Sequence, residues 1–502
     1  MALLGISEIS FLERTDADRI GEVSNFMKWL SRYQSERGFE IKKTQDKGLG
    51  AFATRNLPKG HKLIQIPLNE TIFSGTIRPA FDKCFGNLSV RRRETELLTY
   101  VEISALLIVQ MMAEVLNESS EFKPYLNTIP VMFKIPLYYT PKTLLTLMGS
   151  NAFEFALINY KETISTYISL WMLLYHYETT KSSERQYCQH RFGLTVDVFT
   201  FSLFRWASGA VTTRVFSVKG ANDDGVMLPF VDMLNHDVSR LSITHKYDTL
   251  YNVTNSTNSA NSTPEDALGQ TFDILNISQL YTCTLNKSVT KGDEIYNAYI
   301  FGKVELAQTF QAWGITLPTA PVIVQLTIYD YEHNVDNRYK VISGQEASAD
   351  YYIQNIYVDP NADNGTIISE KGFQFLVSAA TGISTRVESL DNSQWEKTWS
   401  HLEHCINRKL MLYRQKDALI DLTWQTPHKD TNPIEVERNQ LIETHAKSFI
   451  ETEIGIFVSA LEKVEMIKRN ANKYAHLFGI EIHNDDGSIL NEDTKQQGFE
   501  EL

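Results

Sequence analysis

The chain of 502 residues predicts an α+β protein, with small antiparallel β-sheets interrupted by a helical insert and followed by a mostly helical C-terminal domain. Three observations lead to this fold class. Residues 39–73 alternate polar and apolar side chains between glycine and proline turns, which is typical of short antiparallel strands. Residues 85–195 repeat their apolar groups at helical spacing with few turn signals. After Gly314 the composition changes, and helical patterns dominate again.

The N-terminal part predicts one helix and a small β unit. Apolar residues at helical spacing predict a helix over 19–36, with Gly38 as its stop. The alternation of residues 39–73 then predicts an antiparallel β unit, broken at the Gly48-Leu49-Gly50 turn and at the turn over 58–60. The fold therefore begins with a helix that leads into short strands.

The middle of the chain predicts the helical insert and a return to strands. Two helices are expected at 95–116 and 161–178. A third helix at 196–215 leads into further short strands. The Asn/Ser/Thr-rich stretch 251–266 predicts a surface loop.

The C-terminal part predicts a separate helical domain. Helices are expected at 372–381, 395–422 and 434–474, and the residues from 484 predict a loose tail. The resulting segments are an N-terminal helix with the first sheet part (20–84), the helical insert (85–195), the second sheet part (196–315), the helical domain (316–483) and the tail (484–502).

Charge and composition narrow the class of partner. With 48 basic and 61 acidic residues the net charge is −13, which disfavours direct binding of nucleic acid and favours a basic protein partner. The most apolar stretch, 97–116, is interrupted by polar residues, so it predicts a buried helix and no membrane span. No secretory signal is recognisable at residues 1–16, and the cysteines are spaced singly. We therefore expect a reducing compartment, the cytoplasm or the nucleus.

Metal binding is not expected from the sequence. His401, His404 and Cys405 would share one face of a predicted helix, but no fourth ligand accompanies them. The four cysteines form no CxxC pair, which argues against a thiolate zinc site. Nucleotide-binding and hydrolase motifs such as GxxxxGK[ST] and GxSxG are also missing.

Five short segments together resemble one family of enzymes. They are KGLG (47–50), FKPYLNTIP (122–130), WASGAVTTRVF (206–216), LPFVDMLNHD (228–237) and KGDEIYNAYIFG (291–302). Their order resembles that of the SET-domain protein methyltransferases. The helical insert between the motifs is similar to the split-SET group of Rubisco large-subunit methyltransferase-like enzymes, which includes actin-histidine methyltransferases and fungal enzymes that methylate lysines of ribosomal proteins and elongation factors.

The resemblance implies roles for individual residues. It implies that Gly48, Leu49, Gly50, Arg214, Asn235, His236 and Tyr299 bind S-adenosylmethionine. Arg214 would meet the carboxylate of this cofactor, Asn235 its amino acid end, and the backbone of His236 its adenine. Tyr299 would be the catalytic residue, with Tyr296 as a packing residue. Trp313 and Ile315 would line the substrate channel.

The implied reaction is transfer of a methyl group from S-adenosylmethionine to a lysine of a protein, with an amine attacking the sulfonium methyl group in line. The resemblance implies a monomer acting on a basic component of the translation machinery, and a C-terminal domain that contacts it. Two alternatives stay open. One is histidine methylation on the same scaffold. The other is a degenerate binding protein, because the residues after Tyr299 depart from the family pattern.

Overall fold

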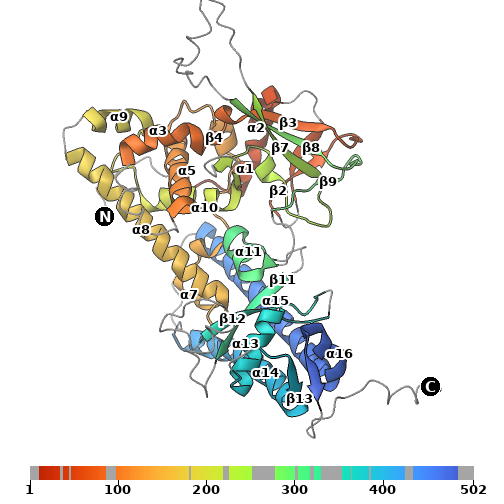
Figure 1. Ribbon diagram of the computed structural model, residues 1–502. Helices are drawn as coiled ribbons and strands as arrows, with labels where there is room; N and C mark the ends of the chain where they lie inside the picture. Colours follow the sequence, from red (N-terminus) through yellow and green to blue (C-terminus); the bar gives the residue numbers. More distant parts are fainter. Residues whose placement is uncertain are drawn as a thin grey trace, which may run out of the picture. The chain divides into compact units, whose positions relative to one another are not determined.

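The computed structural model divides the chain into two compact units (Figure 1). Unit 1 consists of residues 1–133 and 159–300, and unit 2 of residues 134–158 and 301–502. The structure describes residues 11–33, 38–44, 47–85, 98–179, 183–218, 225–250, 278–299, 304–316, 322–329, 353–362, 365–383, 386–423 and 433–483.

Unit 1 contains three small sheets, each of three strands among the residues described, and all of their pairings are antiparallel. The sheet orders are β1(Phe39–Lys43)-β2(Leu49–Ala53)-β9(Glu294–Ile295), β3(Lys62–Pro67)-β8(Ser278–Leu285)-β7(Ile243–Leu250) and β4(Ile72–Phe73)-β6(Gly225–Met227)-β5(Val215–Ser217). In each sheet, strands from the start of the chain pair with strands that lie after the helical insert. The two halves of the predicted β region therefore form one structure.

The helices of unit 1 surround these sheets. They are α1(Asp16–Gly21), α2(Val23–Leu30), α3(Ser74–Phe85), α5(Leu98–Leu116), α6(Lys123–Leu126), α9(Ser183–Phe192), α10(Phe201–Arg214) and most of α8(Asn151–Thr179). The core runs through α10, whose Phe204 and Trp206 are buried. The indole nitrogen of Trp206 donates to Pro130 O at 3.0 Å, which satisfies its polar atom inside the core.

Unit 2 is mainly helical. Its helices are α7(Pro141–Leu145), the start of α8, α11(Leu306–Trp313), α13(Glu370–Thr381), α14(Asn392–Thr423), α15(Pro433–Arg469) and α16(Ala471–Ala475). Its strands are β10(Val304–Glu305), β11(Val322–Tyr329), β12(Ile353–Val358), β13(Ser389–Asp391) and β14(Glu481–His483). Four aromatic rings form the centre of one core: Phe373, Trp395, Trp399 and Phe478.

The α+β class is confirmed, and the helix predictions are close. The helix expected over 19–36 is two short helices, α1 and α2, and begins earlier because Thr15 and Asp18 form a capping box. The helix expected from 161 begins ten residues earlier, at Asn151. The stretch 251–266 and the tail from 484 lie outside the described residues.

Two further observations bear on the sequence predictions. Cys84 in α3 and Cys188 in α9 form a disulfide across 104 residues, a pairing that the single spacing of the cysteines did not indicate. Residues 134–158, which we placed in the insert, belong to unit 2. The segment boundaries drawn from motifs remain predictions. Among the helices that the structure describes, none is both long and apolar enough to cross a bilayer.

Candidate active site

The site begins at the turn between β1 and β2. Gly48 has φ +84°, a backbone conformation that favours glycine, and Thr44 closes the turn by donating its N–H to Gly48 O at 2.6 Å. At Gly50 a side chain has no room, since a Cβ would lie 2.5 Å from Glu294 Oε1 and 2.8 Å from Asn235 Nδ2. The turn therefore needs glycine at 48 for its backbone and glycine at 50 for close approach.

The segment that carries Asn235 and His236 is held by an unusual turn. Phe230 is the one non-glycine residue with positive φ (76°) in the described chain, and its buried ring stacks on Phe39 with the centroids 4.1 Å apart. Such a conformation costs about 1–2 kcal/mol for a residue with a Cβ, and the packing of the ring offsets this cost. The turn places the residues that come after Phe230 beside β9.

A backbone bridge joins this segment to the one that carries Tyr299. Asn297 N donates to Asn235 O, and Asp237 N donates to Asn297 O, both at 2.9 Å. In this parallel bridge between His236 and Asn297, the N–H and C=O of His236 itself take no part. They point away from the bridge, and the implied role of the His236 backbone in binding adenine stays a prediction.

The side-chain amide of Asn235 has a fixed orientation. Its Nδ2 donates to Leu49 O at 3.2 Å and to Glu294 Oε1 at 2.6 Å. The second carboxylate oxygen of Glu294 accepts from the Tyr296 hydroxyl at 2.6 Å. Because both donor bonds come from Nδ2, the Oδ1 atom of Asn235 is the atom that can accept from an ammonium group. Sequence reasoning missed Glu294, although it lies in the same motif as Tyr299.

His236 and Tyr299 contact each other directly. Tyr299 N donates to His236 Nδ1 at 3.0 Å, and the Tyr299 hydroxyl donates to Leu234 O at 2.9 Å. Burial lowers the pKa of His236, so its imidazole is neutral at neutral pH, with the proton on Nε2 because Nδ1 accepts. Burial raises the pKa of Tyr299 to about 12, so its side chain stays a phenol.

Arg214 lies at the end of α10 in a buried network. Its Nη1 donates to Asp232 O and Oδ2, both at 3.0 Å, and Tyr125 donates its hydroxyl to the same Oδ2 at 2.8 Å. Burial lowers the pKa of Arg214, but the nearby Asp232 carboxylate raises it. The net shift is upward, so the guanidinium stays charged. Its Nε atom is buried without a hydrogen-bond partner. The structure thus shows that Arg214 also holds Asp232, a contact that we did not predict.

Arg19 in α1 is a second arginine near the glycine turn, and sequence reasoning missed it. Its Nη2 lies 3.8 Å from the position that a Cβ of Gly48 would occupy, and it pairs with Asp16 at 3.2 Å. Burial lowers its pKa, and the nearby charge of Arg214 lowers it further. Two guanidinium groups whose charges interact, one of them beside the glycine turn, can receive a carboxylate. A buried arginine in α1, separated from the glycine turn by α2 and β1, carried no recognisable signal in the sequence.

The remaining predicted residues have different outcomes. Leu49 is buried in β2, and its carbonyl fixes Asn235. Trp313 and Ile315 belong to unit 2, so their role in a substrate channel stays a prediction. Residues 300–303, directly after Tyr299, lie outside the described part. Among the described residues no group of three or more His, Cys, Asp or Glu side chains could hold a metal ion.

Comparisons with known proteins identify structures of the same fold. No protein-family model matches the chain. The SET domain of LSMT bound to lysine and AdoHcy is similar with a TM-score of 0.60 and 16% identity, covering 90% of this chain and 93% of the other. Rubisco LSMT bound to AdoMet is similar with a TM-score of 0.53 and 16% identity, covering 90% and 92%. The fold is a SET fold.

Sequence relatives cover a shorter region. The actin-histidine N-methyltransferase of Danio rerio is 25% identical over 217 residues, 42% of this chain and 34% of that protein. The human protein of the same name is 24% identical over 225 residues, 44% and 35% respectively. The chain thus spans about a third of the length of the curated relatives it matches.

Proposed function

We propose that this protein is an S-adenosylmethionine-dependent protein methyltransferase. The observation that carries the proposal is the bridge that places Asn235, His236 and Tyr299 beside the glycine turn of β1 and β2. The SET fold and the relatives that are named methyltransferases support it.

The residues present fit the proposed cofactor. The buried Arg214 Nε, which has no hydrogen-bond partner, and the oriented Asn235 amide beside Gly50 match a ligand that carries both a carboxylate and an ammonium group. We assign the carboxylate to Arg214 and Arg19, the ammonium to Asn235 and the adenine to the His236 backbone. Gly48, Leu49 and Gly50 would form the floor of the site.

Once bound, the cofactor supplies an electrophilic methyl group on its sulfonium. The chain contributes position and polarity. The hydroxyl of Tyr299 is fixed by Leu234 O, and its oxygen, still a phenol at neutral pH, can accept a hydrogen bond from the N–H of an approaching acceptor. This interaction orients the lone pair of the acceptor nitrogen toward the methyl group. The acceptor must arrive deprotonated, because a protonated amine has no lone pair.

We propose lysine as the acceptor, as in our sequence reasoning, and histidine as the second candidate. Lysine is supported by the similar structures, which were solved with lysine or methyllysine. Histidine is supported by the sequence relatives, which are named actin-histidine N-methyltransferases. A client from the translation machinery, a monomeric state and a location in the cytoplasm or the nucleus remain proposals that rest on the sequence alone. The alternative that this protein binds a partner without methylating it also remains a proposal.

One experiment tests these proposals together. Purified protein is incubated with tritiated S-adenosylmethionine and a hypomethylated cell extract, alongside Tyr299→Phe, Asn235→Ala and the surface control Lys161→Glu. We expect one labelled band that is weaker with Tyr299→Phe, absent with Asn235→Ala and unchanged with the control. Mass spectrometry of that band then distinguishes lysine from histidine. Binding of AdoHcy without any labelling would favour a binding protein, and the absence of both would refute the proposed function.

A further inference from the structure

Two cations lie over the ring of Tyr296, next to the candidate active site, and a third cation lies beside one of them. Lys47 Nζ lies 5.3 Å and Arg240 Cζ 4.2 Å from the centroid of this ring. Lys287 Nζ donates to Arg240 O at 3.0 Å, which places the third cation in the same group. The hydroxyl of Tyr296 bonds Glu294, which in turn accepts from Asn235. We call Lys47, Arg240 and Lys287 the cation triad.

The triad presents positive charge to solvent. Lys47 and Lys287 are exposed, and the side chain of Arg240 is 58% exposed. Asp237, which binds Arg240 Nε at 2.5 Å, has a side chain that is only 2% exposed. Asp237 therefore lies below the surface. Asp293 is exposed and Glu294 is half-buried in the segment that leads to Tyr296, so a partner would meet the exposed Lys47, Arg240 and Lys287 together with the Asp293 carboxylate.

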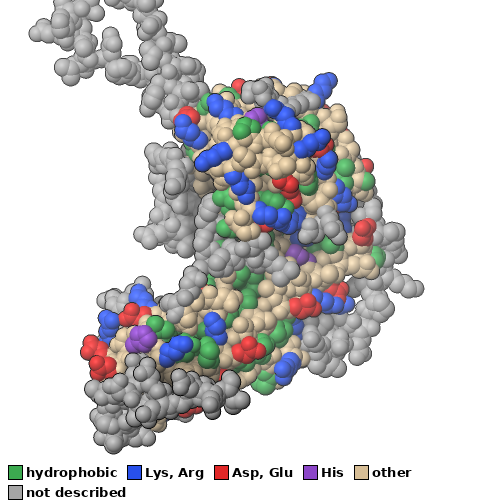
Figure 2. Space-filling model, turned by 90° about the vertical axis from the view of Figure 1, so that its right-hand side faces the viewer, with side chains coloured by type: hydrophobic (Ala, Val, Ile, Leu, Met, Phe, Trp, Pro, Cys, Tyr) green, Lys and Arg blue, Asp and Glu red, His purple; other side chains and the backbone are tan. Residues whose placement is uncertain are grey.

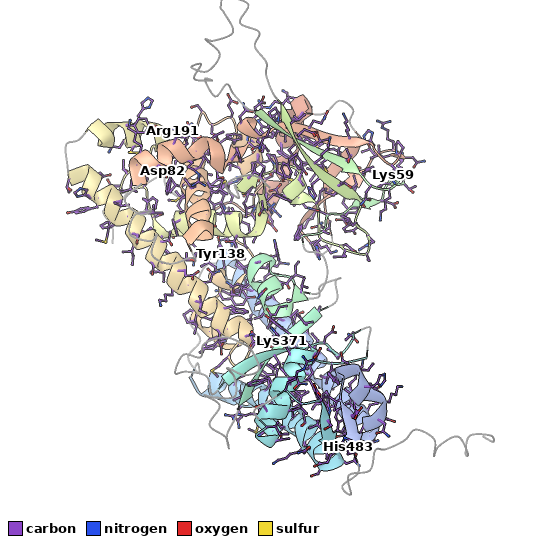
Figure 3. All side chains as sticks on the ribbon, viewed as in Figure 1. Lys59, Asp82, Tyr138, Arg191, Lys371 and His483 are labelled. Atoms are coloured by element: carbon purple, nitrogen blue, oxygen red, sulfur yellow. A yellow bond between two sulfur atoms is a disulfide. The ribbon has the colours of Figure 1, made fainter. Side chains whose placement is uncertain are left out.

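The neighbouring turns extend this basic surface. Gly60 N donates to Leu285 O, so Lys59 lies on the turn beside the one that carries Lys287. Lys291 N donates to Asn56 Oδ1, which places a further lysine at the same end of the sheets. Lys59 projects from this end of unit 1 in Figure 3. In Figure 2, Lys and Arg side chains outnumber acidic ones over the face of unit 1 that the view shows.

This surface contrasts with the charge of the whole chain, which is −13 and led us to expect a basic partner. A net charge governs attraction at long range, whereas specificity depends on the charges that make contact. We propose that the cation triad binds an acidic segment of the protein that is methylated. This inference rests on the proposed function and specifies the class of its substrate.

An acidic peptide fits the triad better than a nucleic acid does. The Tyr296 ring is covered by cations, so it offers no open face on which a base could stack. Arg240 can bind side-chain carboxylates with hydrogen bonds, and the two lysines can bind them as point charges.

The test uses the full chain and three labelled probes: a 12-residue peptide of alternating Glu and Ser, its Lys and Ser counterpart, and a 20-nucleotide single-stranded RNA. Fluorescence anisotropy at about 50 mM salt measures the affinity of each probe. We expect the Glu peptide to bind most tightly and Lys287→Glu to weaken it about tenfold. Lys161→Glu, the same charge reversal on α8 of unit 1, is the matched control and should leave the affinity unchanged. Arg240→Gln should also weaken binding.

The outcomes separate the inference from the proposed function. Tighter binding of the Lys peptide or of the RNA, or equal effects of Lys287→Glu and Lys161→Glu, would overturn the inference. AdoHcy binding is measured by calorimetry on the same preparations. If the wild type fails to bind AdoHcy, the proposed function fails whatever the peptide result. If it binds AdoHcy but not the Glu peptide, only the inference fails.

Discussion

At the scale of single residues, the site depends on the close contact between a glycine and an amide. Gly50, Asn235 and Glu294 come from three separate parts of the chain, and the amide is oriented because Glu294 and Leu49 O both accept from its Nδ2. Removing a hydrogen-bond partner here would change which atom of Asn235 faces the ligand. The atom that Asn235 presents to a ligand thus depends on the orientation of its amide as well as on the residue type.

Gly50→Ala tests the close approach. The added Cβ would lie under 3 Å from both Asn235 and Glu294, so we expect AdoHcy affinity to fall at least about tenfold, as measured by calorimetry. Gly60→Ala is the control, since Gly60 has φ +84° but no atom within 4 Å of its Cβ position. It should cost about 1 kcal/mol of stability and leave AdoHcy affinity unchanged. Equal losses of affinity in both variants would contradict our assignment.

Asp232→Ala tests the buried pair with Arg214. The side chain of Asp232 is fully buried and that of Arg214 is 16% exposed, so the variant leaves a charge with no counterion inside the protein. We expect the free energy of unfolding to fall by about 3 kcal/mol in a urea titration. Tyr125→Phe removes one neutral donor from the same carboxylate and should cost about 1–2 kcal/mol. A smaller loss for Asp232→Ala than for Tyr125→Phe would refute the charged pair.

At the scale of elements, helix ends and cross-links combine local and distant contacts. The N-cap of α11 is Glu305, whose Oε2 accepts from Gln308 N at 2.6 Å, while its Oε1 is buried without a partner. Burial raises the pKa of Glu305 to about 7, helped by the Glu453 charge and opposed by Lys409. The capping role is local, whereas the raised pKa comes mainly from burial, with smaller contributions from the charges of Glu453 and Lys409 on α15 and α14.

Glu305→Gln gives a prediction about pH. Because the pKa of Glu305 is higher in the folded state, its protonated form stabilises unit 2 at low pH, and this contribution is lost as the pH rises through about 7. Glutamine keeps the cap acceptor but cannot ionise. We expect the variant to gain up to about 3 kcal/mol relative to wild type between pH 5 and pH 8, measured by urea unfolding at each pH. A difference that does not vary with pH would contradict the assignment.

The link between α3 and α9 gives a second prediction for elements. A disulfide that closes a loop of 104 residues stabilises by up to about 4–5 kcal/mol through the entropy of the unfolded chain. We expect the double variant Cys84→Ser and Cys188→Ser to be less stable than the oxidised wild type. Reductant should lower the stability of the wild type by the same amount. Thiol titration of the unfolded, unreduced protein should find two reactive cysteines, Cys283 and Cys405. Four reactive thiols would show that the link does not form.

At the scale of the whole molecule, the chain forms two units with separate cores, and the candidate cofactor site lies in unit 1. The charge of the chain is also unevenly distributed, since a chain with a net charge of −13 carries the cation triad beside the candidate cofactor site. A ligand that binds only the folded state must stabilise it in proportion to its affinity. Ligand-induced stability therefore reports on the assignment of the site.

AdoHcy at about a hundred times its Kd should add about 2.7 kcal/mol to the stability of the folded state and raise Tm by several degrees. Differential scanning fluorimetry measures this shift. Asn235→Ala should lose it, while Glu305→Gln, which lies in unit 2, should keep it. A shift of equal size in Asn235→Ala would place the binding site elsewhere.

Most of the helices of unit 1 could be predicted from the sequence, and its motifs named Asn235, His236 and Tyr299, which the structure brings together. Helices such as α5 and α10 depend on local periodicity, and the Asn235-His236 and Tyr299 motifs are contiguous in the chain. The sequence could not predict Glu294 as the partner of Asn235, Arg19 beside Gly48, or the contact between Cys84 and Cys188. Each of these pairs residues that lie far apart along the chain.

The sequence by itself determined the α+β class, the order of the elements and the resemblance to SET-domain methyltransferases, because periodicity, turn residues and motifs are properties of neighbouring residues. Only the tertiary structure decided which strands pair across the helical insert, how the amide of Asn235 is oriented, and that cations gather around Tyr296 in an acidic chain. These features depend on contacts between distant segments, and such contacts exist only once the chain has packed.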